Sequence, residues 1–213
     1  MKFEKTEAWG FEHAIRGMRN PLESWDKSDS CYIDKRFNDQ FHIGKNDLAL
    51  MQKLIKAGSE HRKFLRQIFV AVDIKAPLYW WKEFDTYKVG TVANSTSTMH
   101  KLASTPITMD CFEMDDFSPL IDNYKLDLSW KTIIDYCEQL RQKYNATKDK
   151  RYWKELIRLL PESWLQKRTI TMNYENILNM YRQRKSHKLT EWSKSFCDWV
   201  KTLPYAEELI CLE

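Results

Sequence analysis

The stretch over residues 160–184 constrains the fold more than any other part of this chain of 213 residues. Pro161 ends one helical pattern, because proline lacks the amide that a helix interior needs and restricts the residue before it. Polar and apolar side chains then alternate from Gln166 to Met172, a period of two that predicts a β-strand. A second helical pattern follows directly. The chain must therefore combine strands with helices.

Three polar residues on that second helical pattern are candidates for binding a ligand. Asn173, Asn179 and Arg184 follow one another at spacings of about six and five residues, so they need not share one helix face. Such residues can line the rim of a pocket where a helix meets a strand. Amides and a guanidinium suit a planar, anionic ligand. Without further evidence, residues 182–185 read as a solvated basic face, and Asn173 reads as a helix cap.

The centre of the chain contains a second alternating segment. Residues 67–74 alternate between apolar and mostly polar or small side chains and predict another strand. Pro77 fits the first turn of a helix with aromatic residues over 79–87. Their helical spacing favours packing in a core over stacking on the planar ring of a ligand. Gly90 begins a segment rich in hydroxyl groups, residues 91–98, which we expect to be a loop.

The remaining patterns are mostly helical. Asn46 and Asp47 are suited to cap a helix that Gly58 ends. Residues 110–129 mix acids, a proline and aromatics, and indicate a surface excursion. Further helical patterns cover residues 133–144, 153–160 and 189–203. No repeat or long linker divides the chain, so we expect one α+β domain over 1–213, with helices packed around a small antiparallel sheet.

Composition argues against several classes of protein. The chain has 5 glycines and no glycine-rich phosphate-binding motif, which argues against a Rossmann or P-loop site. Its 5 cysteines are scattered, so neither a disulfide framework nor a metal site is expected. We expect no signal peptide, no membrane partner and a cytoplasmic location, because no apolar run approaches the ~20 residues that span a bilayer. The net charge of +4 is mild and does not require nucleic acid.

Several motifs match one known enzyme family. Lys75-Ala76-Pro77 stands where some members carry the same tripeptide. Asn173, Asn179 and Arg184 match, without a gap, two asparagines that contact flavin and an arginine that polarises uracil. In these features the chain resembles the flavin-dependent thymidylate synthases, which methylate dUMP with methylenetetrahydrofolate as carbon donor and reduced FAD as hydride source. The resemblance extends over nearly the whole length.

The signature motif of that family is Arg-His-Arg-x-x-Ser-x-Asn-Glu-x-Ser-x-Arg. Its basic triplet falls on Thr86, Tyr87 and Lys88, so only the last position keeps a positive charge. With one inserted residue, the asparagine of the motif falls on Asn94 and its second serine on Ser97. A lysine can meet a phosphate as a point charge, although it lacks the planar fork of arginine.

Other segments extend the resemblance. Residues 14–19 resemble an N-terminal run of the family, and Gly58 to His61 resembles the Gly-His that precedes its central strand. Arg158 lies one position away from a nucleotide-binding arginine. The resemblance thus implies FAD as cofactor, with a pyrimidine nucleotide like dUMP, folate and NADPH as partners, and a homotetramer. The implied residues are Arg184 for catalysis, Asn173, Asn179 and His61 for cofactor binding, and Lys88, Asn94, Ser97 and Arg158 for substrate binding.

Three functions of different class remain open at this point. The first is a divergent enzyme that transfers carbon to dUMP or a related nucleotide. The second is a catalytically inactive nucleotide-binding protein on the same fold, favoured because Ser95 and Met99 replace the glutamate and last arginine of the signature. The third is a nucleic-acid-binding module, suggested by a pI near 8.7 and many aromatic residues. No recognised DNA- or RNA-binding signature supports the third.

Overall fold

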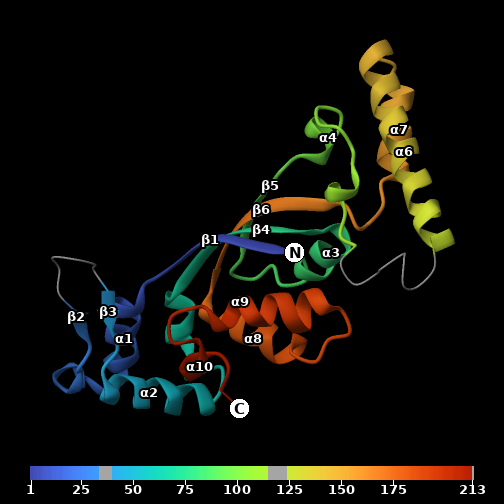
Figure 1. Ribbon diagram of the computed structural model, residues 1–213. Helices are drawn as coiled ribbons and strands as arrows, with labels where there is room; N and C mark the ends of the chain where they lie inside the picture. The colour runs from blue at the N-terminus through green and yellow to red at the C-terminus, as the bar shows by residue number, and fades with distance from the viewer. Residues whose placement is uncertain (34–39, 115–123, 213) are drawn as a thin grey trace. The chain divides into compact units, whose positions relative to one another are not determined.

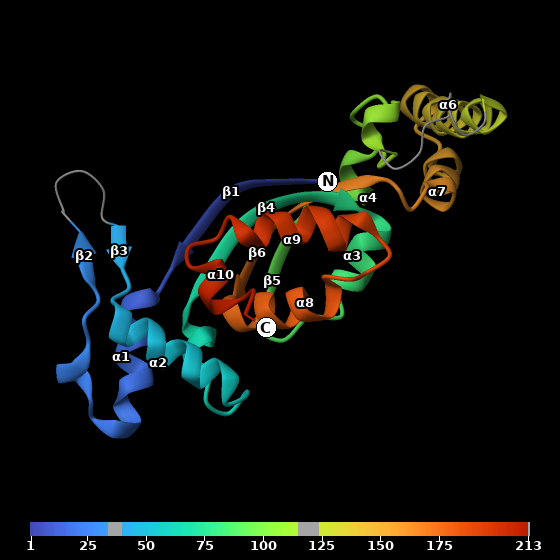
Figure 2. The same cartoon turned by 60° about the horizontal axis from the view of Figure 1, so that its bottom comes forward.

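A computed structural model describes residues 1–33, 40–114 and 124–212, and Figures 1 and 2 show its helices and strands. The fold is α+β with a small antiparallel sheet, as the sequence predicts. The sheet has the order β1-β4-β6-β5. Its strands are β1 (Lys2–Trp9), β4 (Phe69–Pro77), β6 (Leu165–Asn173) and β5 (Val92–Ser95). A separate antiparallel ribbon pairs β2 (Cys31–Ile33) with β3 (Gln40–His42).

The chain divides into two compact units, which we describe separately. We call them the α7 unit and the α8 unit. The α7 unit consists of Met1–Lys2, Ile74–Thr86 and Asn94–Thr169, and the α8 unit of Phe3–Asp73, Tyr87–Ala93 and Ile170–Glu213. The expectation of one domain over residues 1–213 stays a prediction.

The α8 unit packs several helices around large aromatic side chains. Tyr174, Trp192 and Phe196 are fully buried, and the Tyr174 amide donates to the Ile68 carbonyl at 2.9 Å. Figure 1 shows α8 beside α9. The helical elements are α1 (Phe11–Arg19), η1 (Asn20–Leu22), η2 (Trp25–Lys27), α2 (Lys45–Lys56), η3 (Lys63–Gln67), α8 (Tyr174–Arg184), the π-helical η5 (Glu191–Phe196), α9 (Cys197–Lys201) and α10 (Ala206–Leu209).

The described residues of the α7 unit include two apolar clusters. Trp80, Trp81 and Phe84 are buried, and their ring centres lie within 5.4 Å of one another in one stacked and two edge-to-face pairs. The aromatic residues of this helix therefore do form core. The second cluster lies around α6 and α7, which run side by side in Figure 2, and includes Leu102 and Leu156. The helical elements are α3 (Leu78–Phe84), α4 (Thr98–Lys101), η4 (Met109–Cys111), α6 (Tyr124–Thr147) and α7 (Lys150–Leu159).

Both strand predictions based on a period of two are confirmed, because β6 covers residues 166–172 and β4 covers residues 69–74 of the other segment, while Gln67 belongs to η3. The helix before Pro161 ends at Leu159, as predicted. The expected loop over residues 91–98 is wrong in part, since Val92–Ser95 forms β5 at the edge of the sheet. Alanine and asparagine, two of the four residues of β5, are depleted in strands, but backbone pairing suffices for a short edge strand.

The start of α2 also differs from the prediction. Gly44 is the cap position, and Asp47 lies inside the helix with its side chain fully buried. The acceptor that serves the first helical amides is Asp29, which receives hydrogen bonds from the amides of Asn46 and Asp47. Asp47 instead bonds Arg19 at 2.6 Å, a partner distant in sequence that no local pattern reveals.

Two further helix boundaries and one surface segment can be compared with their predictions from the sequence. The aromatic helix α3 ends at Phe84, so Tyr87 lies beyond it. The C-terminal pattern is a π-helical turn followed by α9 rather than one continuous helix. Of the expected surface excursion at 110–129, residues 115–123 lie outside the described part, while Phe112 is buried. Among the described residues, no helix is long and apolar enough to cross a bilayer.

Candidate functional site

The first turn of α8 is built by a reciprocal pair of asparagines. The Asn173 side chain accepts a hydrogen bond from the Asn176 amide at 2.9 Å, and the Asn176 side-chain oxygen accepts from the Asn173 amide at 3.2 Å. This capping box satisfies backbone donors that a helix start otherwise leaves unpaired. It fixes Asn173, which is buried, at the point where β6 passes into α8.

The segment from Tyr87 to Gly90 lies along α8. Near the helix start, the Asn176 side-chain amide donates to the Val89 carbonyl at 2.7 Å. Gly90 has a φ of +79°, and a Cβ added there would lie 3.0 Å from Asn173 Nδ2, so this close approach requires glycine. Near the helix end, the Tyr87 hydroxyl donates to Gln183 Oε1 at 2.9 Å. Lys88, which is exposed, is therefore held beside α8.

The Arg184 side chain is oriented by aromatic neighbours. Its Nε donates to the Tyr87 hydroxyl at 2.9 Å. Its guanidinium carbon lies 5.5 Å from the centre of the Tyr87 ring and 4.9 Å from that of Trp192. Both distances are within the range of cation–π attraction. Arg184 is half-buried, so this member of the basic run is not a fully solvated side chain.

A different face of α8 carries Asn179 and Glu175. Asn179 Oδ1 accepts a hydrogen bond from Arg62 Nη2 at 3.0 Å, and Glu175 Oε1 accepts from Arg62 Nε at 3.2 Å. Arg66 Nε also donates to Glu175. Burial raises the pKa of Glu175, but the hydrogen bonds and charges of Arg66 and Arg62 outweigh it, and the pKa is lowered. Glu175 is therefore a carboxylate at neutral pH.

His61 lies on the rim of a cavity of about 570 Å³ in the α8 unit. That volume is within the range of small-molecule sites. His61 itself is exposed, while Phe64 is buried and forms part of the apolar wall. The other lining residues include Met18, Asn20, Leu22, Leu50, Leu54 and Lys63.

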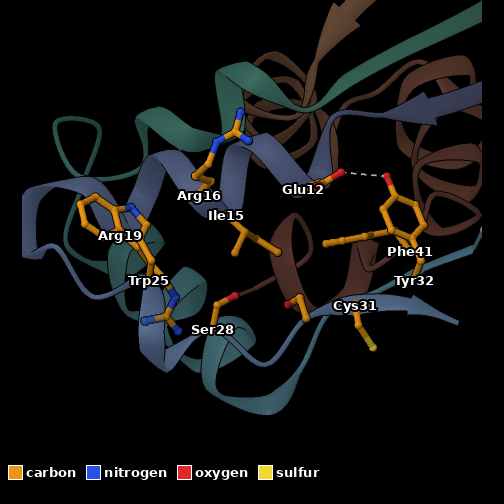
Figure 3. A pocket seen from close by; sticks show the side chains of 10 residues that line it. Glu12, Ile15, Arg16, Arg19, Trp25, Ser28, Cys31, Tyr32 and Phe41 are labelled. Carbon is orange, nitrogen blue, oxygen red and sulfur yellow. Dashed lines mark hydrogen bonds between the residues drawn. The ribbon is translucent and has the colours of Figure 1, made fainter.

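A second cavity, of about 260 Å³, lies between α1 and the β2/β3 ribbon (Figure 3). Trp25 lies at one end and Tyr32 at the other, where its hydroxyl donates to Glu12 Oε2 at 3.0 Å. The charge of Arg19 in its wall is neutralised by Asp47. None of the predicted site residues lines this cavity.

The predicted substrate residues Asn94, Ser97 and Arg158 belong to the α7 unit. Ser97 caps α4 by accepting from the His100 amide at 3.2 Å, and it lines a cavity of about 210 Å³ with Lys75 and Lys101. Asn94 is exposed on β5 and does not line that cavity. Arg158 is exposed on α7 and pairs with Glu155 at 3.2 Å.

No family model matches the chain, and no curated protein sequence matches it. Solved structures do share its fold. One is a flavin-dependent thymidylate synthase, ThyX, from Helicobacter pylori complexed with FAD and dUMP, with a TM-score of 0.71, 18% identity and 100% of each chain covered. A second ThyX structure from that organism, also with FAD and dUMP, has a TM-score of 0.69 and 18% identity. The match covers 99% of this chain and 97% of the ThyX chain. The chain has the ThyX fold.

Within this fold, several residues of the α8 unit hold predicted site residues in place but were not themselves predicted from the sequence. Tyr87 and Trp192 hold Arg184, and Gly90 allows the loop to approach Asn173. Arg62 holds Asn179. A glycine before a hydroxyl-rich segment is a visible signal for a close approach. The pairing of Tyr87 with Arg184 has no such signal, because the two residues are 97 positions apart.

Proposed function

We propose that the chain is a divergent flavin-dependent thymidylate synthase-like enzyme. Its reaction would transfer carbon from methylenetetrahydrofolate to dUMP or a related pyrimidine nucleotide. The observation that carries the proposal is the full-length likeness in fold to a protein complexed with both FAD and dUMP. The oriented guanidinium of Arg184 adds a residue of this chain that suits the chemistry.

Arg184 is the residue to which we assign catalysis. A guanidinium that donates hydrogen bonds to a pyrimidine carbonyl stabilises the negative charge that develops on that oxygen. Such a group accelerates the reaction only if it acts more strongly in the transition state than in the ground state. The ring contacts with Tyr87 and Trp192 favour this, because they fix the guanidinium before the substrate arrives.

The chemistry of the nearby side chains fits FAD, which would supply the hydride. Asn179 uses its oxygen on Arg62, and its amide nitrogen has no partner within the described residues, so it can donate to an acceptor on the cofactor. Asn173 also retains a side-chain amide donor, because the capping box uses its oxygen. His61 borders a cavity of suitable size. We assign these three residues to cofactor binding.

We assign the nucleotide to Lys88, Asn94, Ser97 and Arg158. Lys88 is exposed beside α8 and can meet a phosphate. Ser97 lines its cavity together with two lysines, which supports an anionic ligand there. We further propose folate and NADPH as partners, assembly into a homotetramer, and a cytoplasmic location.

A second candidate is a catalytically inactive nucleotide-binding protein with this fold. The observation that favours it is that Arg184 makes its contacts within the α8 unit itself. Its Nε donates to the Tyr87 hydroxyl, and its guanidinium carbon lies near the rings of Tyr87 and Trp192. A guanidinium held this way could serve stability or nucleotide binding alone.

The test is single-turnover oxidation of bound flavin with dUMP and methylenetetrahydrofolate, alongside equilibrium binding of dUMP. We expect the purified protein to be yellow. Arg184→Ala should lower turnover about 100- to 1,000-fold, the usual cost of losing one preorganised donor, while dUMP affinity falls much less. Arg184→Lys should restore only part of the activity, because an ammonium lacks the planar fork. Lys185→Ala, in the same basic run but exposed, is the matched control.

Two results would count against the enzyme, and a third would count only against the role of Arg184. Colourless protein that takes up no FAD would show that the chain does not use this cofactor. Unchanged turnover in Arg184→Ala would show that Arg184 is not the catalytic residue. Nucleotide binding without turnover in the wild type would favour the binding protein instead.

A further inference from the structure

An arginine cluster lies between η3 and α8, both in the α8 unit. Arg62 and Arg66 reach Glu175 from the η3 segment. Glu175, Asn179 and Arg182 follow one another on α8 at spacings of about four and three residues, which places them on one helix face. The bond from Arg62 to Asn179 extends the cluster along that face.

The cluster has more positive than negative charge. Glu175 is shared by two arginines, and no carboxylate pairs with Arg182 within the described residues. The pKa of Arg182 is lowered, first by partial burial and then by the positive charge of Arg62. Arg62 and Arg182 therefore repel each other, and a bound anion would relieve this repulsion.

An ion pair with a purely structural role would not require three arginines around one glutamate. One arginine is enough to neutralise Glu175, and each added guanidinium brings repulsion and desolvation. The hydrogen bonds use Nε and Nη2 of both Arg62 and Arg66, while Nη1 of each has no partner in the described part of the chain. Arg66 is also half-exposed, with 49% of its side chain accessible. Donors thus remain for a ligand.

We infer that Arg62, Arg66 and Arg182 form an anion site for the pyrophosphate of a dinucleotide, with Glu175 as the residue that positions the arginines. Guanidinium groups bind phosphate oxygens through paired N–H donors. Several guanidiniums spread over a turn of α8 and the facing segment suit two linked phosphates better than one. Asn179, in contact with Arg62, would lie next to this end of the ligand. The inference rests on the proposed function, since FAD is the dinucleotide proposed there.

The test compares three flavins on the full chain. FAD has a pyrophosphate, FMN one phosphate and riboflavin none. Arg182→Gln should weaken FAD about tenfold or more, the usual effect of losing a hydrogen bond to a charged group. It should weaken FMN less and leave riboflavin unchanged. Salt should weaken FAD more than riboflavin, because it screens exposed charge. Arg182 is exposed and unpaired, so the variant should fold, and Lys185→Gln is the matched control.

Inorganic pyrophosphate, titrated by calorimetry, separates this inference from the proposed function. If the wild type binds pyrophosphate and Arg182→Gln does not, the anion site stands even where no flavin binds. If FAD binds equally well to the wild type, Arg182→Gln and Arg62→Gln, the inference is overturned while the flavoenzyme remains. Loss of dUMP affinity without loss of FAD affinity in Arg182→Gln would also overturn it, because the site would then hold a monophosphate.

Discussion

Glu138 of α6 offers a prediction whose size follows from the structure. Its Oε1 accepts from Arg141 Nη2 at 2.6 Å and from Gln142 Nε2 at 2.9 Å. Its Oε2 accepts from Arg141 Nε at 2.7 Å and from the Ile107 amide at 2.8 Å. Arg141 also donates to the Ala103 carbonyl at 3.2 Å. This carboxylate therefore attaches the segment after α4 to α6.

These bonds lower the pKa of Glu138 from an ordinary 4.5 to about 2, and the hydrogen bond from Arg141 is the largest cause. At ~1.4 kcal/mol per pH unit, the difference corresponds to at most about 3 kcal/mol of folding free energy. Because the folded-state pKa is depressed, this contribution is fully present above pH 4.5. It is lost as the pH falls through about 2.

The perturbation is Glu138→Gln, and the assay is urea unfolding followed by tryptophan fluorescence from pH 7 to pH 2. The wild type should be more stable than the variant by about 3 kcal/mol at pH 7 and by less than about 1 kcal/mol at pH 2. Hydrogen exchange at the Ile107 amide should speed up in the variant. Glu155→Gln is the control, because that exposed pair with Arg158 should contribute less than about 1 kcal/mol. A stability difference that does not change with pH would refute the reasoning.

Two further predictions concern the α8 unit. Asp47→Asn should lower the free energy of unfolding by about 3–5 kcal/mol, because it leaves the buried Arg19 without its charge partner. Urea unfolding measures this loss. A loss no larger than that of the exposed control Asp26→Asn would contradict the prediction. Tyr87→Phe keeps the ring but removes the hydroxyl that holds Arg184. The turnover of flavin oxidation should therefore fall about tenfold with little change in the free energy of unfolding. Equal turnover in the variant and the wild type would show that the hydroxyl does not position Arg184.

The elements that the sequence predicted correctly are those with a local cause. The alternation over residues 67–74 and 166–172 is a property of neighbouring side chains, and it identifies β4 and β6. Pro161 stops a helix through its own ring. By contrast, β5 depends on pairing at the edge of the sheet, and the role of Asp47 depends on Arg19, which lies 28 residues away. Such partners cannot be read from a local window.

The basic run at the end of α8 shows the same limit at single residues. In sequence, Arg182, Arg184 and Lys185 read as one solvated basic face. On a helix, however, each residue turns by about 100° from the one before. Arg184 therefore meets Tyr87 and Trp192, whereas Arg182 feels the charge of Arg62. Lys185 remains exposed. Because helix rotation alone separates these roles, substitutions within four consecutive residues can distinguish the pyrimidine end of the proposed site from its pyrophosphate end.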